Sequence, residues 1–282
     1  MPAMPKPPRS SRSAPPAAAG WAEVPVRRFR DGVPRAEVDR LAAEAPLEIR
    51  FGERPFTVLM RTPGHDEELV AGFLFSEGLI RSAAEIRALA HPEALLEGDC
   101  ENVIAVDLAG GGQLVERTFY ASASCGVCGK SSIADLAIRA PKVTSQLTIE
   151  RRVLEALPER LRDEQAIFAE TGGLHGAALF DAGGVLLEAR EDIGRHNAVD
   201  KLIGWALGAG RLPLSQAVLV VSGRLGFEIV QKAIVAGIPL LASVGAASSI
   251  AAGLAERYGL TLATFVRPGS LNLYGDPSRL EE

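Results

Sequence analysis

Two cysteines stand three positions apart between glycines, and their thiols are the groups in this chain best suited to covalent chemistry. The segment reads Cys125-Gly126-Val127-Cys128-Gly129-Lys130. Thiols this close on a flexible backbone suit redox exchange, metal binding or the carrying of a sulfur atom. The loop leads into a predicted helix, and a helix N-terminus beside Lys130 favours the reactive thiolate. We expect Cys125, at the exposed start of the loop, to be the nucleophile, with Cys128 as its neighbour.

Metal binding and thioredoxin-like redox chemistry have less support in the sequence. A structural zinc site takes four ligands, but Cys100 and the four histidines do not repeat the CxxC at ligand spacing. A zinc deaminase would need an HxE ahead of a PCxxC, and Ala123-Ser124 precede Cys125. A thioredoxin-like CxxC follows the first strand of a βαβ unit, whereas this loop joins two halves of the chain. We therefore expect no metal site.

Composition narrows the class of protein. The chain has 282 residues, 47% of them hydrophobic, and a formal net charge of -5, which argues against nucleic-acid binding through a broad basic face. Three cysteines do not make a disulfide framework, so we expect a reducing, cytoplasmic compartment. No apolar run reaches the roughly 18 residues of a membrane helix, so no membrane association is expected. Residues 1–20 lack an apolar signal core and are expected to form a disordered tail.

Residues 21–140 are predicted to form a small α+β domain that ends in the CxxC loop and a helix. A two-residue Gly52-Glu53 turn between alternating segments indicates a type II′ hairpin. Ser82 and Glu85 have the spacing of a capping box for a short helix. The predicted strands span 23–29, 47–51, 56–60, 102–108 and 113–120, and the main helices span 66–77 and 131–139.

Residues 141–282 show a regular alternation of strand and helix. A helical stretch over 149–169, interrupted at Pro158, precedes a hairpin of strands 176–180 and 185–191. Predicted helices at 196–207, 226–236 and 249–258 then alternate with strands at 217–221, 239–244 and 261–266. This order predicts an α/β domain with a mostly parallel sheet and helices on both faces.

Polar and small residues follow the predicted strands. In open α/β sheets, ligands bind beyond the carboxyl ends of the strands. The segments there are 191–196, 222–224, 245–248 and 267–270. Each combines small residues with a polar or basic group, which suits a phosphate-bearing ligand. Arg224 and Glu228 are spaced i,i+4, and the spacing fits a local ion pair as well as a phosphate clamp. His196 and Asp200 are spaced i,i+4 on a predicted helix, as are Asn197 and Lys201, so neighbouring turns stack them. The alternative to a ligand-site role is a solvated helix face with a salt bridge.

Six segments, taken in order, resemble one protein family. They read CGVCGK, TGGLHGA, EDIGRHNAVDK, SGRLGFEIVQKA, AGIPLLASVGA and FVRPGSLNLYG. They are similar to the formate dehydrogenase accessory sulfurtransferase (FdhD) family. The resemblance implies that Cys125 accepts sulfur from a cysteine desulfurase as a persulfide, with Cys128 assisting or dispensable. The sulfur would then pass to the bis-(molybdopterin guanine dinucleotide) molybdenum cofactor, before the cofactor enters formate dehydrogenase.

The resemblance also implies a fold and a ligand site. The C-terminal domain would have a cytidine-deaminase-like fold, and the protein would be a homodimer. The guanine-nucleotide part of the cofactor would bind near one C-terminal segment, so that GDP or GMP could mimic it. With the strand-end residues, the expected cofactor-binding set is Phe265, Val266, Arg267, Pro268, Gly269, Ser270, Ser222, Gly223, Arg224 and His196. In this chain Pro268 splits the arginine-glycine pair that is usual in the family.

The sequence thus favours a cytoplasmic sulfurtransferase that acts through a Cys125 persulfide. The alternative is a cofactor-binding chaperone whose CxxC holds zinc or closes as a disulfide. Zinc bound at one atom per chain would favour the chaperone.

Overall fold

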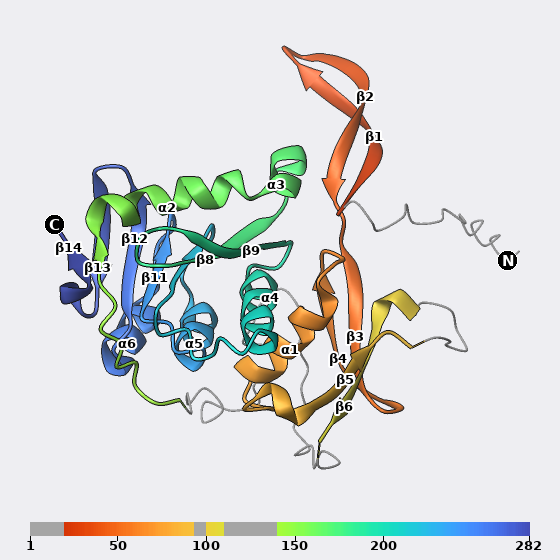
Figure 1. Ribbon diagram of the computed structural model, residues 1–282. Helices are drawn as coiled ribbons and strands as arrows, with labels where there is room; N and C mark the ends of the chain where they lie inside the picture. Colours follow the sequence, from red (N-terminus) through yellow and green to blue (C-terminus); the bar gives the residue numbers. More distant parts are fainter. Residues whose placement is uncertain (1–19, 93–99, 110–139) are drawn as a thin grey trace, which may run out of the picture.

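The computed structural model describes residues 20–92, 100–109 and 140–282 (Figure 1). Residues 1–19 of the predicted tail, the CxxC loop, the strand at 113–120 and the helix at 131–139 lie outside these residues. The helices are α1 (Asp66–Ser76), α2 (Arg151–Asp163), α3 (Ala166–Thr171), α4 (Arg195–Gly208), α5 (Phe227–Val235) and α6 (Ser249–Tyr258).

The first half of the chain contains a four-stranded sheet in the order β4-β3-β6-β5. Its strands are β3 (Ala45–Phe51), β4 (Arg54–Arg61), β5 (Ile86–Ala90) and β6 (Val103–Leu108). The β3–β4 hairpin is confirmed, and Gly52 has φ 59° at the first turn position, as a type II′ turn requires. The capping box at Ser82 is present, but it starts only a single 3₁₀ turn before β5.

The second half contains a six-stranded sheet in the order β13-β12-β11-β10-β8-β9. Its strands are β8 (His175–Phe180), β9 (Leu186–Asp192), β10 (Val218–Val221), β11 (Leu240–Ser243), β12 (Thr261–Arg267) and β13 (Ser270–Tyr274). The prediction of a mostly parallel sheet is wrong. Only the β10–β11 and β11–β12 pairs are parallel, because a hairpin adds antiparallel strands at each side. The short strands β7 (Ile149–Glu150) and β14 (Leu280–Glu281) pair separately.

Helices cover both faces of this sheet, as predicted. On one face, α4, α5 and α6 pack against residues such as Leu179 and Leu219; on the other, α2 packs against Phe180 and Val220. Pro158 lies inside α2, and the break between helices falls at 164–165, which corrects the predicted interruption. Leu154, Leu157 and Leu161 of α2 are buried at helical spacing, and this packing holds the helix together across the proline.

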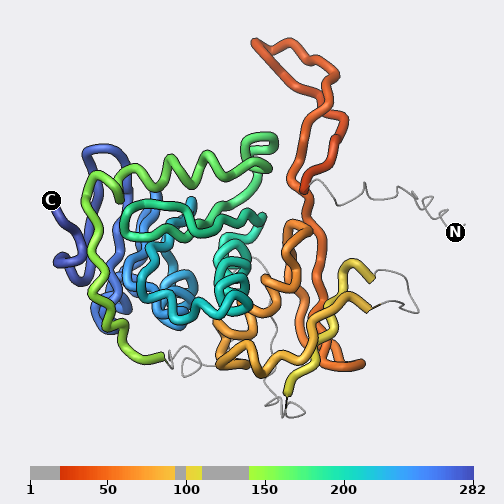
Figure 2. Tube along the Cα trace, in the orientation of Figure 1, coloured from red at the N-terminus to blue at the C-terminus, as the bar shows by residue number. Residues whose placement is uncertain are grey.

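A ribbon of two strands, β1 (Trp21–Arg30) and β2 (Val33–Ala42), projects from the body (Figure 1, Figure 2). The first strand and the turn at Asp31-Gly32 were predicted, but the second strand was not. Near its base the ribbon meets α3, where Arg40 forms an ion pair with Glu170. Towards the tip, apolar side chains such as Phe29 and Val33 are exposed.

The two halves meet where α1 crosses α4 at two glycines. A Cβ at Gly72 would lie 1.8 Å from the Asp200 carbonyl oxygen, and one at Gly204 would lie 1.8 Å from the Glu68 carbonyl oxygen. The helix backbones are therefore in direct contact. Beside this crossing, Arg190 donates two hydrogen bonds to Glu68 at 2.7 and 2.8 Å.

Substitution of either crossing glycine should separate the helices. We expect Gly72→Ala and Gly204→Ala each to lower the free energy of unfolding by about 3 kcal/mol or more, because the new methyl group meets backbone atoms. Gly208→Ala, with no atom within 4 Å of its new Cβ, is the control in α4 and should leave stability unchanged or raise it. Urea denaturation measures all three, and equal stability of Gly72→Ala and Gly208→Ala would contradict the crossing.

Candidate functional site

The segments that follow β10, β11 and β12 are in backbone contact at the carboxyl edge of the mixed sheet. A Cβ at Gly245 would lie 3.2 Å from backbone atoms of Gly223 and Arg224. The Phe265 N–H donates to the Gly245 carbonyl oxygen at 3.1 Å. Because β8 runs antiparallel to β10, its first residue, His175, reaches the same edge. The structure thus brings together the strand-end segments, and what they bind stays a prediction.

The segment after β12 is a tight hairpin turn. Arg267 pairs with Ser270, and Gly269 has φ 76°, so Pro268 and Gly269 occupy the two central positions of a type II turn. The Gly269 N–H donates to the Glu155 carboxylate at 2.8 Å. The proline that interrupts the usual arginine-glycine pair is thus accommodated by the turn, and Arg267 remains exposed.

Phe265 has a backbone conformation that is unusual for a large side chain. Its φ is 51°, in the left-handed region, at an irregularity of β12 between Thr264 and Arg267. Such a conformation is strained for a bulky residue and is found most often at functional sites. Its side chain is 46% exposed, whereas Val266 beside it is 2% exposed. The aromatic ring is therefore available at the edge, and Val266 offers only its backbone.

His196, in the first turn of α4, is nearly buried and uncharged at neutral pH. Burial lowers its pKa to about 3, helped by the positive charges of Lys232 and Arg195. Its Nε2 lies 3.7 Å from the Glu228 carboxylate, and this contact is polar rather than ionic because the ring is neutral. Glu228 therefore faces His196. Within the described part of the chain, Glu228 forms no ion pair with Arg224, and Arg224 is exposed.

His175 is the second histidine of this edge. Burial lowers its pKa, and the Arg195 charge lowers it further. The Ser222 hydroxyl oxygen accepts a hydrogen bond from the Gly176 N–H at 2.9 Å and lies 3.5 Å from the His175 Nδ1. His175 thus joins the edge through Ser222, one of the predicted site residues.

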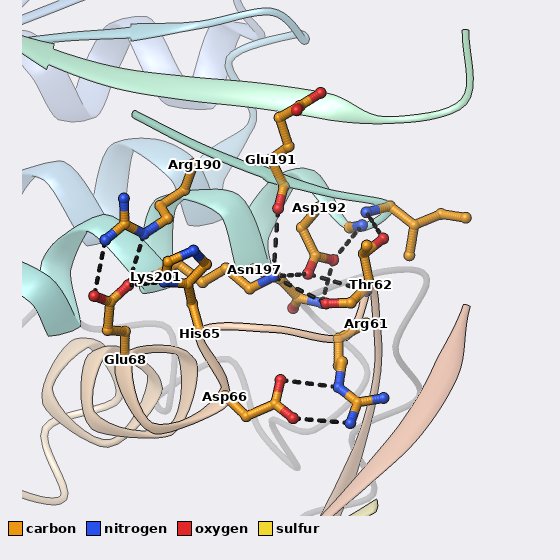
Figure 3. Close-up of polar contacts among 12 residues, drawn as sticks. Arg61, Thr62, His65, Asp66, Glu68, Arg190, Glu191, Asp192, Asn197 and Lys201 are labelled. Carbon is orange, nitrogen blue, oxygen red and sulfur yellow. Dashed lines mark hydrogen bonds and ion pairs between the residues drawn. The ribbon is translucent and has the colours of Figure 1, made fainter. Parts of the chain in front are cut away.

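A buried polar network holds the start of α4 in place (Figure 3). The Asp192 carboxylate accepts hydrogen bonds from the N–H groups of Gly194 and Thr62, at 2.8 and 3.2 Å, and from the Asn197 amide at 2.9 Å. Lys201 lies 2.8 Å from the same carboxylate and donates to the Thr62 carbonyl oxygen at 3.0 Å. No sequence signal pointed to Thr62, because it comes from the first half of the chain.

The polar residues of α4 are buried, so the alternative of a solvated helix face is wrong. Asp200 and Lys201 are each 1% exposed, and Asn197 is 8% exposed. Asp200 accepts hydrogen bonds from Lys232 of α5 and Ser76 of α1, at 2.8 Å each. The i,i+4 spacing placed these groups on one face, but their partners lie on other elements.

The predicted catalytic residues, Cys125 and Cys128, lie outside the described residues. Cys100 is a free thiol in a 3₁₀ turn. Within residues 20–92, 100–109 and 140–282, no three His, Cys, Asp or Glu side chains are grouped as a metal site. Over the same residues, no helix has the length and apolar character to cross a membrane.

The neutral state of His196 should make stability depend on pH. The native pKa of about 3 lies below the ordinary value of 6.5, so only the unfolded chain binds a proton in mild acid. The free energy of unfolding should therefore fall by about 1 kcal/mol between pH 7 and pH 5.5, and much less in His196→Asn. Urea denaturation at both pH values measures this. An unchanged pH dependence in His196→Asn would contradict the assignment.

Comparison with known proteins identifies the family. The sequence profile described as the FdhD/NarQ family matches residues 42–281. A Streptomyces avermitilis protein named sulfur carrier protein FdhD is 47% identical over 90% of this chain and 94% of its own length. A protein of the same name from Mycobacterium tuberculosis is 47% identical over 86% of this chain and 92% of its own. One from Sulfolobus acidocaldarius is 40% identical over 92% of this chain and 98% of its own.

A solved structure agrees with the sequence comparisons. It is the crystal structure of a Desulfotalea psychrophila protein assigned as a formate dehydrogenase accessory protein. The two chains are 26% identical with a TM-score of 0.72, and the match covers 93% of this chain and 99% of the other. The same α/β architecture therefore occurs in both proteins. The profile match and the 40–47% identities over most of its length show that this chain belongs to the FdhD/NarQ family.

Proposed function

We propose that this protein is a cytoplasmic sulfur carrier that is required for formate dehydrogenase activity, with Cys125 as the carrying residue. The observation that supports it most is the near full-length similarity to proteins named sulfur carrier protein FdhD. The matched region, residues 42–281, includes the CxxC loop. A pair of thiols three positions apart supplies the nucleophile that a carrier needs.

The proposed reaction has two sulfur transfers. The Cys125 thiolate first attacks the terminal sulfur of a persulfide on a cysteine desulfurase. A new S–S bond forms on Cys125, the donor S–S bond breaks, and the donor cysteine leaves as a thiolate. The terminal sulfur then passes to the molybdenum of the bis-(molybdopterin guanine dinucleotide) substrate. The molybdenum supplies the electron pair of the new bond and is oxidised by two electrons, while the transferred sulfur is reduced to sulfide. The Cys125 S–S bond breaks in this step, and Cys125 returns to a thiolate.

The carboxyl edge of the mixed sheet is the proposed cofactor site. Arg224 and Arg267 are exposed there, and guanidinium groups bind phosphate as a fork. Phe265 offers an exposed ring, which can stack on a planar base such as guanine. These features support binding of the guanine-nucleotide part of the cofactor. We also propose a homodimer, as the family resemblance implies.

Cys125→Ser should abolish sulfur loading, because the hydroxyl group cannot form a persulfide. The wild-type protein is incubated with a cysteine desulfurase and cysteine, and peptides are mapped by mass spectrometry under non-reducing conditions. An added sulfur atom is expected on Cys125 of the wild type and of a Cys100→Ser control. The proposal fails if Cys125→Ser still supports formate dehydrogenase activity in cells that lack the native carrier.

Arg267→Ala should weaken GDP binding by about tenfold, because it removes a charge-assisted contact with phosphate. Isothermal titration calorimetry measures the dissociation constant. Arg211→Ala is a matched control, since the Arg211 guanidinium packs over the Trp205 ring at 5.1 Å, in the loop after α4. Equal GDP affinity in Arg267→Ala and the wild type would show that the turn after β12 is not part of the ligand site.

A further inference from the structure

One face of the β1–β2 ribbon is apolar and exposed where the ribbon projects from the body (Figure 1). Residues directly opposite each other in an antiparallel pair point to the same face, and so do residues two positions apart. The apolar face therefore consists of Pro25, Phe29, Pro34, Ala36 and Val38. Phe29 is 64% exposed and Val38 is 62% exposed. A two-stranded ribbon is only marginally stable in water without further packing, so this face suits contact with another surface.

The opposite face of the ribbon is polar, and most of its charges are paired within the ribbon. The Arg28 guanidinium lies 3.1 Å from the Glu37 carboxylate and 3.0 Å from the Asp39 carboxylate. Arg30 lies 3.9 Å from the same Glu37 carboxylate. Two arginines and two carboxylates thus form a network of their own on this face. The apolar face is the one that the described residues leave uncovered.

Two charges of opposite sign flank the middle of the apolar face. Glu23 and Arg27 each lie two residues from Pro25 along β1, and both point to the apolar side of the ribbon. Arg27 is exposed, and no ion pair joins it to a carboxylate of the described residues. The Glu23 carboxylate lies 3.7 Å from Arg40, which also pairs with Glu170. Each of the two flanking charges can therefore accept a further partner of opposite sign.

The two charges are related by symmetry about the pair formed by Pro25 and Val38. When a second ribbon is turned by half a rotation about an axis through this pair, its strands run antiparallel to the first and β1 lies over β1. Arg27 of each copy then faces Glu23 of the other, and apolar side chains meet at the axis. A surface that matches its own twofold image is what an isologous contact requires. A partner of unrelated sequence would give no reason for this match.

We propose that the apolar face of the ribbon binds the same face of a second copy of this chain, with a twofold axis at the Pro25–Val38 pair. The inference rests on the proposed homodimer, because it assigns the surface through which the two copies meet. Strands of 10 residues, at about 3.4 Å per residue and a width of about 10 Å, give roughly 340 Å² of flat face per copy. Two such faces are smaller than a standard stable interface, so this dimer should dissociate on dilution.

Sedimentation velocity over a range of protein concentrations measures the dissociation constant of the dimer. Val38→Arg places two positive charges at the axis and should weaken the dimer by about tenfold or more. Val24→Arg is the matched control, because Val24 is an exposed valine on the polar face of the same ribbon, opposite Asp39. The control should leave the dissociation constant unchanged.

Charge reversal tests the twofold pairing itself. Glu23→Arg and Arg27→Glu each bring like charges together at both symmetric contacts, so each should weaken the dimer by about tenfold. In an equimolar mixture of the two variants, one copy carries two arginines at these positions and the other carries two glutamates. Both contacts of the mixed dimer then join opposite charges, and mixing should restore the wild-type dissociation constant. A mixture that associates as weakly as either variant alone would overturn the pairing.

The outcomes separate the ribbon contact from the proposed function. If Val38→Arg dimerises as well as the wild type, the ribbon contact is wrong and the homodimer stands on another surface. If the wild type is monomeric at every concentration, both the contact and the homodimer are wrong. Thermal unfolding checks the fold of each variant, and the mixture decides the result if Val38→Arg misfolds. Loading of Cys125 with sulfur reports on the carrier step independently.

Discussion

The backbone contact between α1 and α4 determines how the two halves of this protein are arranged. Gly72 and Gly204 allow the helices to approach until a single methyl group would overlap the opposite backbone. Contact this close fixes the rotation of each helix about its axis and its position along that axis. A small shift would bring larger side chains into collision. The buried ion pairs beside the crossing then find partners at fixed distances. The Lys232 Nζ, for example, lies 2.8 Å from each carboxylate oxygen of Asp200.

The candidate ligand site depends on this contact between α1 and α4, although the site lies at the carboxyl edge of the six-stranded sheet. Arg195 and His196 begin α4, and the turn before them is held by Asp192. Asp192 in turn binds the backbone of Thr62, which follows β4 in the first half of the chain. A buried carboxylate with several donors has one well-defined position, because any other leaves a charge without a partner. The first half of the chain therefore contributes to the site by positioning it.

Much of the fold could be predicted because its signals are local. The β3–β4 hairpin followed from its turn glycine, and α1 followed from its apolar spacing and the glycine after it. Strand direction was predicted less well. β13 was missed because the turn at Pro268-Gly269 looked like a loop, and its antiparallel pairing helps to make the sheet mixed. A hairpin partner this short carries little pattern of its own.

The site shows the same division between local and long-range information. The strand-end segments could be predicted to meet, since they follow from the order of strands and helices. The partners of the buried charges could not. Spacing along α4 suggested that Asn197 faces Lys201, yet Lys201 binds Asp192 and a backbone carbonyl from the first half. Pairs that form across more than a hundred residues leave no periodic signal in one sequence. The roles proposed for the site residues therefore remain predictions.

The strained backbone at Phe265 has a consequence for how this protein can change. A left-handed conformation costs about 1–3 kcal/mol at a bulky residue, and folded domains are stable by only about 5–15 kcal/mol. The Phe265 ring at the proposed ligand edge is thus held in place at a cost in folding stability. Selection for a more robust fold would relax this position first, and selection for ligand binding would oppose it. Under the proposed function, folding stability and ligand binding are opposing demands at this one residue.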